Sequence, residues 1–266
     1  MKLIKRNVAM YFRLMGQQVK VLLEYKIDLL IMSLSSIFTC TLGLIFLGVI
    51  FEKIPQINGW SLDQMLLIYG MVTFSEGLAS LLFEGVWSLP FSINSGGLDK
   101  YLLRPLSMTL QVISSKIGVN GLGNIVIGLV IVGYSLNNTG IDWTTGKVIT
   151  FLLIFLFVSI ISASINLAAN SISFWYKNAG ISLPVSINGF HEFGKYPINI
   201  YNHAIQLILI FVLPYAFIGF IPASFLFEKT IWKYFWFLCP IVSIYCIWSS
   251  LFLFKAGLKR YESAGN

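Results

Sequence analysis

Two short stretches of the sequence resemble motifs that do chemistry, but neither has the complete set of residues. HEFGK, at 191–195, begins like the helix of a zinc protease and lacks the second histidine four residues after the first. GIDWTTGKV, at 140–148, has five residues between its glycines instead of four, and valine where a phosphate loop has serine or threonine to hold Mg²⁺. We therefore expect no metal site, no catalytic residue and no nucleotide hydrolysis in this chain. His191 and His203 are expected to be ordinary interface residues.

The remaining candidates are polar side chains inside long apolar stretches. Glu76 lies about twelve residues into the second stretch, where an ionisable group either pairs with a base or backbone amides, or belongs to a functional site. Five polar residues of the fourth stretch share one side of a helix: Ser159, Ser162, Asn166, Asn170 and Ser173. A stripe of this length should avoid lipid, and it either hydrogen-bonds another helix or lines a hydrated path.

The elements that must hold these residues are membrane-spanning helices. Of the 266 residues, 57% are hydrophobic and 11% are charged, against about 25% charged in soluble domains. Six apolar stretches are long enough to cross ~30 Å of hydrocarbon, and lipid forces each to be helical. They cover residues 27–51, 64–83, 108–136, 147–175, 201–221 and 231–254. The expected fold class is an all-α integral membrane protein with six transmembrane helices.

The basic residues predict the orientation. If both termini are cytoplasmic, all but four of the 18 Lys and Arg residues lie inside, the exceptions being Lys53, Lys147, Lys229 and Lys233. Cytoplasmic loops of membrane proteins carry such an excess of basic residues. We therefore attribute the net charge of +7 to the cytoplasmic face, and we expect no nucleic-acid partner. The chain divides into a cytoplasmic interfacial helix at 1–26, a six-span domain at 27–254 and a cytoplasmic tail at 255–266.

The first 26 residues form an amphipathic pattern. Apolar side chains gather on one side of the helix: Val8, Tyr11, Met15, Val19 and Leu22. Basic side chains gather on the other: Lys2, Arg6, Arg13 and Lys20. This pattern is typical of a helix lying in the membrane interface in contact with lipid. The alternative is a solvated helix that packs on protein.

GGLDKYLLRPLS, at 96–107, reads as a short capped helix between the second and third spans, at about 97–105. Asp99 is a good N-cap, and Leu98 before it can pack on Leu103. Pro105 pushes Arg104 out of helical geometry and ends the helix. This short helix either joins two spans along the membrane surface or docks a cytoplasmic partner.

Two further patterns predict how the spans are held. The third span carries a stripe of small residues on which another helix can approach closely: Ser114, Gly118, Gly121 and Gly128. Lys116, near its cytoplasmic end, is expected to reach towards the headgroups. Residues 176–201 mix turn formers and aromatic residues with Glu192 and Lys195, and are expected to form a second structured cytoplasmic contact.

Three stretches carry a resemblance to a known family: GGLDKYLLRPLS, EFGKYPINIY at 192–201 and LPYAFIGFIPASFLF at 213–227. With six spans, interior termini and a basic N-terminal helix, the chain resembles the ABC type-2 permeases, the membrane subunits of ATP-driven exporters. The likeness is to their small bacterial branch without an extracellular domain. It implies a multi-pass protein of the bacterial cytoplasmic (inner) membrane.

The resemblance also implies partners and residue roles. Two separate ATPase subunits would bind ATP and Mg²⁺, and the chain itself would need no cofactor. A second permease subunit, identical or related, would complete the pathway. Residues 98–104 would be the coupling helix that rests in a groove of the ATPase. Leu98, Tyr101 and Leu102 would make its contacts, Asp99 and Arg104 would orient it, and Lys100 and Leu103 complete the segment.

Three other classes of protein remain as alternatives. A lipid-modifying membrane enzyme needs clustered acids or histidines at the membrane surface, and the eleven acids here are scattered. A secondary transporter usually shows internal repeats and broken helices at the midplane, and no convincing repeat is found. A structural subunit of a membrane complex has no sequence signature that separates it from a permease.

Overall fold

The chain folds almost entirely into helices. The computed structural model describes residues 2–176, 180–229 and 231–262, and the side chains from residue 9 onward. Lys177, counted above as cytoplasmic, and residues 263–266 of the predicted tail lie outside the described residues. Within those ranges the only β-structure is an isolated bridge between Ile57 and Trp60. The expected all-α integral membrane class is confirmed.

Five segments are long and apolar enough to cross a membrane: Lys26–Lys53, Leu62–Asn94, Asn120–Asn138, Thr145–Phe174 and Ile231–Leu258. The long helices are α1 (Lys2–Glu24), α2 (Lys26–Lys53), α3 (Leu62–Phe83), α7 (Asn120–Asn138), α8 (Thr145–Ser171) and α13 (Cys239–Leu258). The short ones are α4 (Leu89–Asn94), α5 (Asp99–Leu102), α6 (Met108–Ile113), α9 (Ser182–Asn188), α10 (His191–Gly194), α11 (His203–Leu207) and α12 (Phe220–Leu226).

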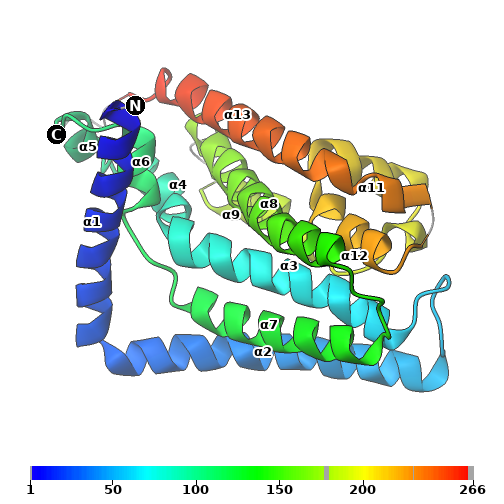
Figure 1. The fold of residues 1–266 in the computed structure, drawn as a ribbon. Helices are drawn as coiled ribbons and strands as arrows, with labels where there is room; N and C mark the ends of the chain where they lie inside the picture. Colours follow the sequence, from blue (N-terminus) through cyan, green and yellow to red (C-terminus); the bar gives the residue numbers. More distant parts are fainter. Residues whose placement is uncertain (1, 177–179, 230, 263–266) are drawn as a thin grey trace.

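The long helices run along a common direction, and α1 lies across one end of them (Figure 1). This end also holds α5 and the last turn of α13, and we call it the proximal end; the opposite one is the distal end. The Tyr11 hydroxyl of α1 donates a hydrogen bond to the Leu82 carbonyl at 2.7 Å, and Met15 is buried. Val19 is 45% exposed, so only part of the apolar face packs on protein. Placement in the lipid interface stays a prediction.

The third predicted span, 108–136, is not one helix. It divides into α6 and α7, with a break between Ile113 and Asn120. Near the break, the hydroxyls of Ser114 and Ser115 bond back to carbonyls of the preceding turn, which competes with continuing the helix. Only α7 is long enough to cross.

The fifth predicted span, 201–221, is wrong as a crossing. The segments His203–Val212 and Tyr215–Leu226 meet at 76°, with a π-helical turn at Ile208–Val212 and Pro214 in the bend. Before the pair, the Asn199 carbonyl accepts a hydrogen bond from Asn58 of the α2–α3 loop. After it, Glu228 binds Lys147 at the start of α8, at 2.7 Å. Because the α2–α3 loop and the start of α8 both lie at the distal end, the pair is a re-entrant hairpin.

The fifth passage is made instead by a chain of short helices. The end of α8 lies at the proximal end, where Phe174 meets Phe254 of α13, and Asn199 lies at the distal end. Residues 180–200 therefore run between the two ends through α9, α10 and the 3₁₀ turn Ile198–Ile200. The number of passages stays at six, so both described ends of the chain lie on the same side.

The small-residue stripe of α7 packs directly on α3. A Cβ placed on Gly128 would lie 2.7 Å from the backbone nitrogen of Phe74, and one on Gly121 would overlap the carbonyl of Gly77. Gly77 of α3 is equally close to α7, since its Cβ would lie 2.7 Å from the nitrogen of Ile125. The predicted close approach of two helix backbones is confirmed.

Replacing Gly128 by leucine should separate α3 from α7 and lower the free energy of unfolding in detergent by about 2 kcal/mol, the usual cost of overpacking. The matched control is Gly133→Leu in the same helix, because a Cβ there meets nothing within 4 Å. Thermal unfolding of both variants measures the difference. Equal stability would show that the two backbones do not depend on this contact.

Candidate functional site

The segment around α5 is a short helix at the proximal end (Figure 1), but its cap differs from the prediction. Leu98 takes the N-cap position in helical geometry without a side-chain cap bond. Asp99 is not the cap: its carboxylate accepts a hydrogen bond from the Tyr261 hydroxyl at 2.9 Å. Burial and this hydrogen bond raise the pKa of Tyr261 to about 12, so the phenol keeps its proton at physiological pH.

The two leucines expected to pack on each other point in opposite directions. Leu98 is fully buried and Leu103 is 87% exposed, so the predicted hydrophobic staple is absent. Leu98 packs in a cluster with Phe174 and Phe254, among others. It is therefore an anchor and, contrary to the sequence analysis, has no surface left for a partner.

A second set of contacts fixes α5 from the other side. The Gln111 amide of α6 donates hydrogen bonds to the carbonyls of Tyr101 and Leu106, at 2.9 and 3.1 Å. Outward, Leu102 is 56% and Leu103 87% exposed, with Lys100 and Arg104 exposed beside them. Thus α5 is hydrogen-bonded to α6 and to the segment after α13, and it presents two exposed leucines flanked by basic residues.

The second candidate region is a chain of charged groups that links α3 to α10. His191 Nε2 lies 3.1 Å from Glu76 Oε1 and 2.9 Å from Glu192 Oε1. Lys195 Nζ lies 2.6 Å from the same Glu192 oxygen and 5.2 Å from the centre of the Tyr69 ring. Because Tyr69 and Glu76 belong to α3, Glu192 and Lys195 lie between the helices and are not the predicted second cytoplasmic contact.

A cavity of about 350 Å³ adjoins this chain of charges. It is lined by Glu76, Ser80, Glu84, Trp87, Asn120, Asn124, Asn166, Val185, Asn188, Gly189 and His191. We call it the polar cavity. It lies among the proximal half of α3, the start of α7, the last turns of α8 and the α9–α10 connection, and it brings Glu76 and Asn166 together.

The rest of the polar stripe of α8 faces protein. Ser159, Ser162, Asn170 and Ser173 are all buried, as expected for a stripe that avoids lipid. The Ser159 hydroxyl and the Asn170 amide donate to carbonyls one turn earlier in α8. The described hydrogen bonds of these two residues therefore stay within their own helix, and the role of the stripe stays a prediction.

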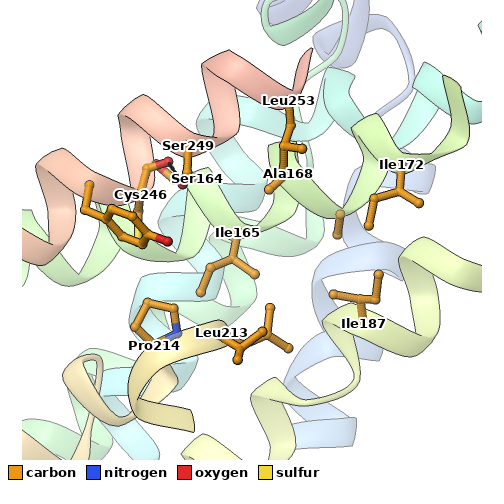
Figure 2. Close-up of a pocket in the computed structure, with 13 residues that line it drawn as sticks. Ser164, Ile165, Ala168, Ile172, Ile187, Leu213, Pro214, Cys246, Ser249 and Leu253 are labelled. Atoms are coloured by element: carbon orange, nitrogen blue, oxygen red, sulfur yellow. Dashed lines mark hydrogen bonds between the residues drawn. The ribbon is translucent and has the colours of Figure 1, made fainter. Parts of the chain in front are cut away.

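A separate cavity of about 320 Å³ lies where the hairpin bend meets α8 and α13. Figure 2 shows Leu213 and Pro214 of the bend opposite Ile165 of α8, with Cys246 and Ser249 on α13. Its lining is mainly apolar, with no charged group among its residues. It suits packing of the bend better than chemistry.

Sequence reasoning found Glu76 but not its partners. His191 was expected to be an ordinary interface residue, and it is instead the base that pairs with Glu76. The sequence analysis assigns no role to the other lining residues Glu84, Trp87, Asn120, Asn124 and Asn188. A weak signal existed: an acid inside an apolar stretch requires a partner, and HEFGK supplies two bases in one short segment.

The fold thus has six passages, a polar cavity among the helices and an anchored helix with two exposed leucines. The family model described as ABC-2 family transporter protein matches residues 37–265, so the chain belongs to this family. It is a permease subunit of an ABC transporter, the membrane component and not the catalytic one. Membership also implies association with an ATPase subunit. No curated protein and no solved structure gives a match.

Proposed function

We propose that the chain is half of an exporter: it forms the translocation pathway with a second permease subunit, identical or related, and is driven through α5 by two separate ATPase subunits. These subunits bind ATP and Mg²⁺, and this chain needs no cofactor. The observation that carries the proposal is the division of α5 into a buried anchor, Leu98, and an exposed pair, Leu102 and Leu103.

The anchoring explains how α5 transmits motion. A push on Leu102 and Leu103 reaches α6 through Gln111 and the end of α13 through Tyr261. Leu98 carries the same displacement into the cluster around Phe254. A flexible loop would absorb this motion, whereas packed side chains pass it on.

The charge distribution supports a cytoplasmic proximal end in the bacterial inner membrane. Lys53, Lys147, Lys229 and Lys233 all belong to loops or helix ends of the distal end, whereas α1 and the end of α13 are basic. Lys195 is the exception, since it lies inside and pairs with Glu192. The side chain of Glu192 is 60% exposed in the single chain, and a second permease subunit on this face would enclose it.

Purification from native membranes tests the proposal. An ATPase subunit should co-purify in equal number with the permease subunits, and ATP hydrolysis by the complex should rise when the permease is present. Transport in proteoliposomes should require ATP. A lone chain that transports without ATP would identify a secondary transporter and contradict the proposal.

A further inference from the structure

The polar cavity is lined by acids and amides without a permanent base. Glu76 and Glu84 lie on its wall, and neither lysine nor arginine is among its lining residues. We propose that this cavity binds an organic cation, the protonated amine or quaternary ammonium group of the transported molecule. That the ligand is transported rests on the proposed function; that it is a cation rests on the cavity alone.

The charged groups that line the cavity leave a negative balance. His191 contacts Glu76 and Glu192 and completes the lining, while Lys195 is engaged by Glu192 outside it. Lys116 is exposed in the break before α7 and acts on Glu84 only through its field. Both ring nitrogens of His191 face oxygen acceptors, so the imidazole is charged. Within the lining, the carboxylates of Glu76 and Glu84 still exceed this charge by one. A cation is the ligand that this balance favours, because excess negative charge attracts positive charge.

The uncharged groups of the wall are also suited to a cation. Asn188 is 6% exposed, its amide nitrogen donates to the Pro184 carbonyl, and its Oδ1 is buried without a partner. Such an acceptor favours a ligand that donates a hydrogen bond or carries positive charge. Trp87 adds an indole to the wall, and tryptophan is the aromatic ring that attracts cations most strongly.

The size and donor set indicate an organic cation and not a metal ion. The cavity volume of about 350 Å³ falls at the lower end of the ~300–1,000 Å³ typical of small-molecule sites. Over the described parts of the chain, no three His, Cys, Asp or Glu side chains are grouped closely enough to hold a metal. Choline is therefore a suitable test ligand, and 3,3-dimethyl-1-butanol is its neutral isostere.

The test uses the purified complex in nanodiscs of phosphatidylglycerol, which has no amine in its headgroup. We expect choline to bind at least tenfold more tightly than the neutral alcohol in titration calorimetry. Glu84→Gln should weaken choline binding at least fivefold and leave the alcohol unchanged. Glu84 is chosen because Ser80 is its hydrogen-bond partner, so its replacement leaves the Glu76–His191 pair intact. Glu52→Gln, which removes a carboxylate at the distal end of α2, should change neither ligand.

A second variant keeps the test decisive if Glu84→Gln does not fold. Asn188→Asp adds charge at nearly constant shape and should strengthen choline binding at least threefold. Equal binding of choline and the alcohol, or no response to either variant, overturns the proposal. Loss of choline binding in phosphatidylethanolamine nanodiscs would support the cation site and identify a lipid amine as its occupant.

The same preparation separates the two proposals. If ATPase subunits are present and hydrolyse ATP but choline does not bind, the cation site is refuted and the exporter stands. If choline binds to a preparation in which no ATPase ever associates, the site stands and the exporter is refuted.

Discussion

Replacing Leu102 and Leu103 together by aspartate should abolish the stimulation of the ATPase by the permease, with at least a tenfold loss, while the permease still inserts and folds. Both side chains are exposed, so the change costs the isolated chain little. In a groove of the ATPase each leucine would contribute about 1.5–3 kcal/mol of burial, and each aspartate would add an uncompensated charge. Steady-state ATP hydrolysis and co-purification of the ATPase measure the loss.

The control lies at the same end of the bundle. Tyr176→Asp changes another exposed side chain, 61% accessible, just beyond the end of α8 and outside α5. It should leave stimulation within twofold of the native value. If the double aspartate variant stimulates ATP hydrolysis as well as the native chain, α5 is only a connector and the coupling proposal fails.

Replacing the anchor Leu98 should have a different effect from replacing the exposed residues Leu102 and Leu103. Leu98 is fully buried in the cluster with Phe254, so its replacement disturbs folding before it disturbs docking. The sequence located the helix correctly because Gly96, Gly97 and Pro105 bound it. It did not reveal which leucine faces inward, since a helix of four residues has too few positions for its buried side to show in the pattern.

The four long helices α2, α3, α8 and α13 could be predicted because unbroken apolar length decides them. Their observed limits lie within a few residues of the predicted ones, except at the distal start of α13, where 3₁₀ turns precede Cys239. The hairpin could not be predicted in this way. Residues 201–221 are as apolar as a span, and hydropathy does not record that Pro214 turns the chain back.

The true fifth passage was missed for the opposite reason. Residues 180–200 include His191, Glu192 and Lys195, which read as a surface loop when the charges are taken singly. In the folded chain they neutralise one another and Glu76 of α3, so the segment can lie among the spans. The signal is a tertiary one: the partner acid lies more than one hundred residues earlier in the sequence, and no local pattern connects them.

In the Glu192–Lys195 ion pair, removing the acid should destabilise the protein more than removing the base. Glu192→Gln should lower the free energy of unfolding in detergent by about 3 kcal/mol, the usual result of leaving a buried ion without its partner. The Lys195 side chain is only 10% exposed and would lose its direct counter-ion. Lys195→Met should cost about 1 kcal/mol, because Glu192 is 60% exposed and keeps both water and His191, and exposed ion pairs contribute little.

The double variant decides between pairing and separate roles. If Glu192→Gln destabilises the protein only because it leaves the Lys195 charge unpaired, then adding Lys195→Met should recover stability. The double variant should be about 2 kcal/mol more stable than Glu192→Gln alone, a coupling that independent sites do not show. Thermal unfolding gives the energies, and hydrogen exchange over residues 182–200 should show the loss confined to the fifth passage. Additive effects, or a Lys195→Met variant as unstable as Glu192→Gln, would contradict the pairing. Recovery in the double variant would show that this passage lies among the helices because its charges cancel there.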